Sequence, residues 1–195
     1  MMTDHLPRRS GGRTARDTTR RADAEFDALF LAHYTGVFRQ AYRVTGNAQE
    51  AEDLAQETFV RLYRQPFDPD RDHNVRAWLL KVVTNLAFNA IRGNRRRDKR
   101  EDAVFDDRAA VPDPADVAVR RDEQTMVREV LYSLPERQAR LLFLRHAGLS
   151  YNELANALDV APGSVGTLLA RAHTAFADAF QEAAAGPAGG NNDDT

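Results

Sequence analysis

Apolar residues recur at intervals of three or four along most of the chain, a spacing that places them on one face of an α-helix. This pattern predicts a first helix over about 24–44, a second over about 48–65 and a third over about 75–93. Asn47 caps the second helix, and Glu50 completes an approximate capping box. No segment shows sustained two-residue alternation with β-branched residues, so the sequence predicts an all-α fold.

A second group of helices begins near residue 115. After a break at Pro135, Ser150 and Glu153 form a capping box at the start of a short helix. A tight turn follows, and Pro162 opens a longer helix that ends near residue 184. This order is typical of a helix-turn-helix, and a plain helical hairpin in a bundle is the alternative.

The two groups predict two small helical domains, one a bundle of three to four helices and the other a helix-turn-helix domain. The segment between them is acidic, has weak periodicity and contains two prolines, so we expect a flexible acidic linker. The Arg-rich N-terminus and the Gly-rich C-terminus lack apolar periodicity, so we expect a disordered basic arm and a flexible tail. The predicted boundaries are 1–24 (arm), 25–97 (first domain), 98–114 (linker), 115–184 (second domain) and 185–195 (tail).

The amino-acid composition argues against several classes of function for this protein. The 195 residues include no cysteine, which excludes disulfides and cysteine-based zinc sites. The five histidines form no H-x-x-x-H pair, and there is no Gly-rich phosphate loop, so we expect no catalytic site, metal or cofactor. No apolar run reaches the length of a membrane span and no signal peptide is evident, which predicts a cytoplasmic protein without membrane contact.

Charge is segregated along the chain, although the net charge is only −2. Residues 92–100 hold six basic residues against one acid. Because nucleic-acid binding depends on local basic patches, the average charge does not exclude DNA as a partner.

The second predicted helix carries an acidic stripe. Asp53, Gln56 and Glu57 lie opposite its core face, and Leu54 also lies off that face. One interpretation is a solvated surface, partly neutralised by a Glu57–Arg61 pair at i,i+4. The other is a docking surface for a basic partner, because apolar residues stand beside the clustered acids.

The third predicted helix is polar and basic away from its apolar stripe, and the loop before it supplies aromatic residues. Cations that hold phosphates, next to a pocket for an unstacked base, suit single-stranded DNA. The alternative is an exposed helix with a charged end. The last helix differs from this, because Arg171 is the one charged residue on its outward face near Ser164 and Thr167. Its predicted DNA contact is therefore weak, and the alternative is that this face meets protein.

Three segments together resemble bacterial sigma factors of the extracytoplasmic-function (ECF) type. AEDLAQETFVRLYR resembles region 2.2 of that family, and RAWLLKVVTNLAFNAIR is similar to region 2.3–2.4. LPERQARLLFLRHAGLSYNELANALDVAPGSVGTLLARA resembles region 4. The resemblance covers about 25–93 and 115–180, in the order and spacing of the family.

The resemblance implies a protein that binds RNA polymerase core and directs it to promoters. Region 2.2 would dock on the β′ clamp, region 2.3–2.4 would hold the melted −10 strand, and region 4 would enter the −35 major groove and touch the β flap. An anti-sigma factor held on both domains is a further implied partner. The implied positions are Asp53, Leu54, Gln56, Glu57, Phe59 and Tyr63 for core polymerase; Phe67, His73, Asn74, Arg76, Lys81, Asn85, Arg92, Arg95 and Arg96 for −10 DNA; and Ser164, Thr167, Leu168 and Arg171 for −35 DNA.

Some positions depart from the family pattern. Gly166 and Leu168 stand where basic residues are usual, and Asn89 stands where Asp is common. Two other functions stay open at this point: a stand-alone helix-turn-helix regulator, and a protein-binding relative of sigma factors that reads DNA weakly.

Overall fold

The structure, a computed structural model, describes the backbone of residues 15–64, 74–98 and 115–185, and the side chains of 23–64, 74–94 and 123–185. Every element in the described ranges is a helix, which confirms the all-α class. The rest of the predicted arm, linker and tail lies outside the described residues. The elements are α1 (Ala15–Thr45), α2 (Ala48–Arg64), α3 (Val75–Asp98), α4 (Ala115–Ser133), α5 (Glu136–His146), α6 (Tyr151–Leu158), the 3-10 turn η1 (Pro162–Ser164) and α7 (Val165–Ala185).

The first helix begins earlier than its apolar pattern predicted. Residues 15–24, expected in the disordered arm, belong to α1. This part of the sequence has no apolar period, but it also contains neither glycine nor proline. Extending an existing helix requires no new nucleus, so helix-compatible residues can continue it without a buried face of their own.

The turn between α1 and α2 depends on Gly46, whose φ of +74° is a conformation that favours glycine. Asn47 caps α2 as predicted, because its Oδ1 accepts the Glu50 N–H at 3.0 Å. The capping box is not closed, however. The Glu50 carboxylate accepts a hydrogen bond from Asn94 of α3 at 3.3 Å, while the Asn47 N–H donates to the Thr45 hydroxyl at 3.3 Å. The Glu50 side chain therefore links α2 to α3.

The first domain packs α1, α2 and α3 around a core that includes Phe59, Leu79 and Val83. Phe59 is its aromatic centre, with its ring centroid 4.8 Å from that of Phe30 and 6.4 Å from that of Phe26, both of α1. Trp78 of α3 packs against this cluster and is partly buried.

The second domain is built from α4, α5, α6 and α7. Gly148, with φ +87°, follows α5, and Ser150 then opens α6 with the capping box that the sequence predicted. The turn after α6 places Asp159 in the left-handed region at φ 53°, where glycine is favoured and aspartate is tolerated. Leu154, Val165 and Leu169 interlock the helices of the helix-turn-helix.

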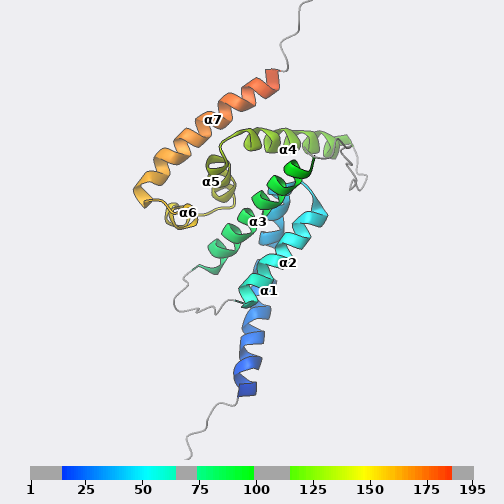
Figure 1. Cartoon of the computed structure of the whole chain (residues 1–195), viewed down its shortest axis with the longest axis vertical. Coiled ribbons are helices and arrows are strands. Elements are labelled where there is room, and N and C mark those ends of the chain that lie inside the picture. The colour runs from blue at the N-terminus through cyan, green and yellow to red at the C-terminus, as the bar shows by residue number, and fades with distance from the viewer. Residues whose placement is uncertain (1–14, 65–73, 99–114, 186–195) are drawn as a thin grey trace, which may run out of the picture.

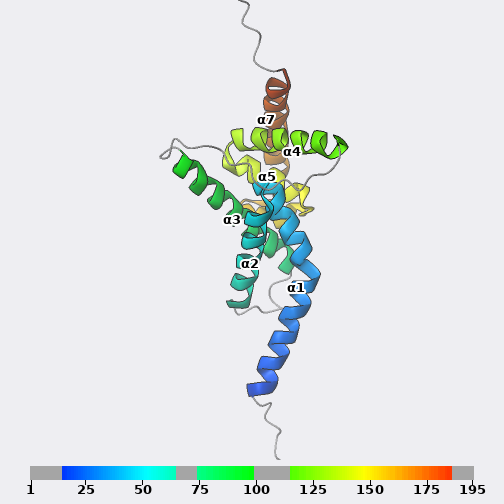
Figure 2. The same cartoon turned by 90° about the vertical axis from the view of Figure 1, so that its right-hand side faces the viewer.

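The two domains pack directly against each other. Figures 1 and 2 show α4 to α7 gathered alongside α3 and the C-terminal half of α1, with the N-terminal half of α1 projecting away. Phe88 of α3 meets Phe143 of α5 edge to face, with ring centroids 5.9 Å apart. Gln40 of α1 is fully buried, and its amide donates to the Thr84 hydroxyl at 3.1 Å and to the Phe143 carbonyl at 3.4 Å. The predicted pair of domains is confirmed, and they share a continuous interface.

Candidate protein and nucleic-acid interfaces

The acidic stripe of α2 lies at the surface. Asp53 and Gln56 are exposed, and the Glu57 carboxylate accepts a hydrogen bond from Arg61 at 2.8 Å, which is the predicted i,i+4 pair. Tyr63 and Val60 extend this surface with exposed apolar area, since Tyr63 is 64% exposed and Val60 is 39% exposed. The stripe thus combines carboxylates with accessible apolar side chains.

Two predicted polymerase-binding residues lie elsewhere. Phe59 is only 2% exposed in the core of the first domain, so it positions α2 from within and presents no surface to a partner. Leu54 is half-buried and packs against both the first-domain core and the shared core between the domains. Phe59 was a polymerase candidate only through the family resemblance, because the helical wheel places it on the core side of α2. The wheel misplaced Leu54 alone, since α2 packs over a wider arc than one helix indicates.

The start of α3 is fixed by Asn74, whose side-chain oxygen accepts the Ala77 N–H at 3.0 Å. Its amide nitrogen donates to Glu153 of α6, in the other domain. Arg76 donates to the Ala147 carbonyl at 2.5 Å, and Lys81 donates to the Asn156 carbonyl at 3.1 Å. Three residues that the sequence predicted for −10 DNA therefore contact the helix-turn-helix domain.

Further along α3, Arg92 forms an ion pair with Glu136 at 3.2 Å and also donates to Asn89. Asn85 is half-buried. Arg95 and Arg96 belong to α3, but their side chains, like all of Phe67 and His73, lie outside the described residues.

The outward face of the helix-turn-helix is accessible. Ser164, Thr167 and Arg171 are exposed around the start of α7. Leu168 is partly buried against the second-domain core, so its side chain helps to seat α7 and is less available to a partner than predicted. Arg171 is thus the one cation among the four predicted −35 residues.

Glu153 holds the start of α6 in place. Its carboxylate accepts the Ser150 N–H at 2.5 Å, and its own N–H donates to the Ser150 hydroxyl at 3.4 Å. The pKa of Glu153 is lowered, mainly because its carboxylate accepts the hydrogen bond from the Ser150 backbone. The residue that caps α6 therefore stays negatively charged where it meets Asn74.

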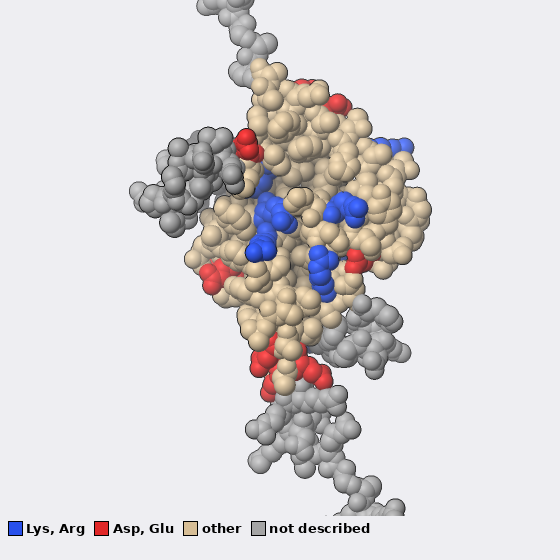
Figure 3. Space-filling view, turned by 180° about the vertical axis from the view of Figure 1, so that it is seen from behind, with Lys and Arg blue, Asp and Glu red and all other residues tan. Residues whose placement is uncertain are grey.

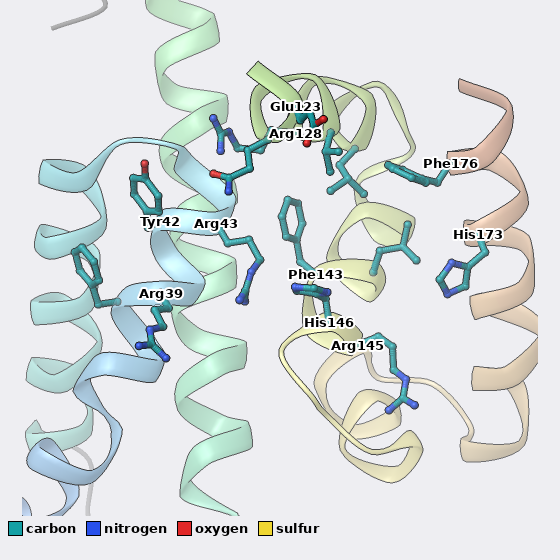
Figure 4. A pocket seen from close by; sticks show the side chains of 15 residues that line it. Arg39, Tyr42, Arg43, Glu123, Arg128, Phe143, Arg145, His146, His173 and Phe176 are labelled. Carbon is teal, nitrogen blue, oxygen red and sulfur yellow. The ribbon is translucent and has the colours of Figure 1, made fainter. Parts of the chain in front are cut away.

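The sequence did not predict the cleft between the domains. It has a volume of about 910 Å³, with α1 on one side and α4, α5 and α7 on the other. Figure 4 shows Arg43 of α1 and His146 of α5 on opposite sides of this space. Burial lowers the pKa of Arg43 and of His146, and the charge of Arg43 lowers the pKa of His146 further. Much of the lining is apolar, and it includes Phe38, Tyr42, Val127, Leu142, Phe143 and Phe176.

The cleft is also cationic. Besides Arg43, it is lined by Arg39, Arg128 and Arg145, against the single carboxylate of Glu123. On the face seen in Figure 3, basic side chains gather around the middle, and a group of acids lies apart from them near the N-terminal part of the chain. Among the described residues, the ion pairs of the protein involve none of these four arginines. The site could therefore accept a partner with both apolar and acidic groups.

A weak sequence signal for the domain contact does exist in α3. Leu79 and Val83 face the first-domain core, whereas Leu80, Ala87 and Phe88 face the second domain. A helix that is apolar over so wide an arc has to be covered on more than one side. The polar contacts of Arg76 and Lys81 to backbone carbonyls have no such signal, because any residue supplies a carbonyl.

Comparison with known families agrees with this division of the chain. Residues 29–97 match sigma-70 region 2, and residues 124–175 match sigma-70 region 4. A region 2 domain followed by a region 4 helix-turn-helix defines a sigma-70-type protein. More specifically, the chain belongs to the ECF group of RNA polymerase sigma factors. It is 30% identical over 159 residues to the ECF RNA polymerase sigma factor SigL of Mycobacterium tuberculosis, covering 80% of this chain and 88% of SigL.

The ECF RNA polymerase sigma factor SigE of Mycolicibacterium smegmatis is 36% identical over 155 residues, which cover 76% of this chain and 57% of SigE. The RNA polymerase sigma-H factor of Pseudomonas aeruginosa is 32% identical over 166 residues, covering 80% of this chain and 86% of the relative. The chain thus spans little more than half the length of SigE but most of sigma-H.

Two solved structures share the fold. The sigma factor RpoE in complex with the anti-sigma factor NepR, from Bartonella quintana, superposes with a TM-score of 0.58 at 21% identity, over 80% of this chain and 97% of RpoE. CnrH in complex with the cytosolic domain of CnrY gives a TM-score of 0.60 at 20% identity, over 84% and 94%. In the described part of this chain, no helix is long and apolar enough to cross a membrane.

Proposed function

We propose that this protein is an alternative sigma factor, which binds RNA polymerase core and directs promoter recognition, −10 melting and transcription initiation. The observation that carries the proposal is the region 2 match followed by the region 4 match in a chain of the ECF group. In this role the chain itself is not an enzyme, since the polymerase performs the phosphodiester chemistry. The protein would act in the cytoplasm, where the polymerase is.

The acidic stripe of α2 is the proposed contact with the β′ clamp. Asp53, Gln56, Glu57 and Tyr63 are accessible together, so a basic partner surface could pair with the carboxylates and cover the tyrosine. Leu54 would support this surface from its edge. An exposed i,i+4 ion pair stabilises a helix by only about 0.3–0.5 kcal/mol, so the stripe is poorly explained as a stability device.

Substitution of Glu57 by lysine tests this contact. Glu57→Lys should lower the affinity for core polymerase about ten-fold or more, with little change in thermal stability, because the lost ion pair is exposed. Glu182→Lys on α7 is the matched control, since it makes the same charge change at an exposed helical site. Binding of labelled protein to core polymerase measures both, and a wild-type affinity for Glu57→Lys would exclude the stripe as the docking surface.

The α3 residues are the proposed −10 contacts. Arg76, Lys81 and Arg92 would hold phosphates, and Asn74 and Asn85 would meet bases or sugar. Trapping an extruded base offsets the few kcal/mol that unstacking costs. Run-off transcription with core polymerase from a matched host tests the whole function, and a protein that binds no core polymerase would contradict it.

The nearly uncharged α7 surface favours a second candidate, a sigma relative that reads −35 DNA weakly. If α7 enters the major groove, Arg171→Ala should lower −35-dependent transcription, because it removes the one cation from the predicted −35 set. Unchanged promoter choice in this variant would favour the second candidate. A stand-alone regulator would instead bind duplex DNA tightly without polymerase, which a gel shift detects.

An anti-sigma factor is the proposed occupant of the cleft between the domains. Both solved neighbours were captured with a protein partner, and NepR is named an anti-sigma factor. The apolar residues and the arginines that line the cleft suit an amphipathic helix with an acidic face. Arg43→Glu should weaken binding of such a partner by reversing a charge at the centre of the cleft.

A further inference from the structure

A second, smaller cavity between α1, α3 and α5 is lined by basic side chains from all three helices. It has a volume of about 410 Å³ and adjoins the larger cleft. We call it the arginine cavity, after Arg39 and Arg43 of α1 and Arg76 of α3, which line it together with His33 of α1 and His146 of α5. None of the described residues in this lining carries a carboxylate.

The α1 wall of the cavity combines small residues with cations. Ala32, Gly36, Arg39 and Arg43 stand at i, i+4, i+7 and i+11, so they share one face of the helix. A Cβ atom at Gly36 would meet no atom within 4 Å. Glycine destabilises a helix interior relative to alanine, and no neighbour requires it here. It leaves open space against the backbone of α1, beside the two arginines.

The three arginines retain unused hydrogen-bond donors. A guanidinium has five N–H groups. With described residues as partners, Arg39 forms no hydrogen bond or ion pair, Arg43 donates to Gln40 at 3.0 Å, and Arg76 donates to the Ala147 carbonyl. Most of these N–H groups are therefore available to a ligand that is rich in oxygen.

The electrostatic potential in the arginine cavity is positive. Burial and the charge of Arg76 lower the pKa of His33, and burial and the charge of Arg43 lower the pKa of His146. The Glu153 carboxylate acts on Arg76 from outside the lining, which leaves the α1 arginines unbalanced. Figure 4 shows Arg39 and Arg43 on α1, with His146 of α5 across from them. An anion is the ligand that this arrangement favours.

We propose that the arginine cavity binds a compact multivalent anion of the phosphate class, either inorganic pyrophosphate or the polyphosphate tail of a nucleotide. Guanidinium groups pair with two oxygens at a time, and a tetrahedral phosphate presents oxygens in several directions, as α1, α3 and α5 require. An anion with one charge would leave most of the cations unbalanced. The volume falls within the range of roughly 300–1,000 Å³ that is typical of small-molecule sites. The inference does not rest on the proposed transcription function.

Calorimetric titration of the full chain with pyrophosphate tests the site. Arg39→Gln should weaken binding about ten-fold, because it removes charged hydrogen-bond donors from the anion. Arg64→Gln on α2 is the matched control, since it removes the same charge from an exposed helical position outside the cavity, and it should leave the Kd unchanged. Pyrophosphate should also raise the thermal unfolding midpoint of the wild type, because the anion binds groups of the folded protein only.

A second variant leaves every arginine and histidine in place. Gly36→Glu adds a carboxylate to the cavity wall, where its Cβ has open space. The new carboxylate should pair with the arginines, so the variant should lose pyrophosphate binding while its unfolding midpoint rises. Gly93→Glu on α3 is the matched control, because that glycine also has open space and lies outside the cavity. It should bind pyrophosphate like the wild type.

The choice of anion identifies the source of the phosphate. ADP that binds as tightly as pyrophosphate would indicate a nucleotide tail, whereas weaker binding of ADP would indicate the free inorganic anion. Equally tight binding of citrate would show that the cavity selects charge alone and would overturn the phosphate class. Absence of pyrophosphate binding by the wild type, or a wild-type Kd in Arg39→Gln or in folded Gly36→Glu, would overturn the site itself. Run-off transcription tests the sigma function separately, so these outcomes leave it standing.

Discussion

Truncation of Phe143 tests whether the two domains unfold as one unit. Phe143 belongs to α5, is 2% exposed and packs against Phe88 of α3 across the domain interface. Removing a buried phenylalanine ring costs about 3–5 kcal/mol. With a urea dependence of roughly 2–3 kcal/mol per molar for a chain of this size, Phe143→Ala should lower the unfolding midpoint by on the order of 1–2 M.

The single tryptophan makes this measurement specific. Trp78 packs against the core of the first domain, whereas Phe143 belongs to the second. If the shared core couples the domains, Phe143→Ala should shift the urea transition followed by Trp78 fluorescence as far as the transition followed by circular dichroism. A Trp78 transition that stays at the wild-type midpoint would refute the argument. Val83→Ala is the positive control, because its cavity lies in the tryptophan's own domain and has to shift the fluorescence transition.

Three further predictions follow from local features. Ser150→Ala should lower the free energy of unfolding by about 1 kcal/mol, since it removes the N-cap acceptor of α6, and thermal denaturation measures this. Gly166→Ala should raise the free energy of unfolding by roughly 0.5–1 kcal/mol, because the added methyl group would make only an ordinary contact of 3.8 Å with Tyr151. If this more stable variant binds −35 DNA more weakly, the DNA needs the backbone at position 166 to be free of a side chain. Stability should also fall as the pH drops below about 6.5, the ordinary pKa of histidine, because the pKa values of His33 and His146 are lowered in the folded state and the unfolded chain therefore takes up protons first. Urea unfolding at several pH values tests this, and His146→Gln should reduce the slope; an unchanged slope would show that His146 does not contribute.

The sequence alone determined the helices and most of their ends. The Ser150–Glu153 capping box, the turn at Asp159 and the Glu57–Arg61 pair involve residues within a few positions of one another. Such contacts depend on backbone geometry that a short segment fixes by itself, so their residue types can be recognised without the fold. The acidic stripe of α2 was predictable for the same reason, because its exposed members recur at helical spacing.

Only the tertiary structure decided which faces are covered and by what. Leu54 looked available on the helical wheel and packs against two cores, while Leu80 leaves its own domain to join the core of the other. The partners of Arg76 and Lys81 are backbone carbonyls that lie 71 and 75 positions further along the chain. A carbonyl has no residue identity, and the packing of two apolar faces depends on the shape of both. These contacts therefore become visible only when the two domains are placed together.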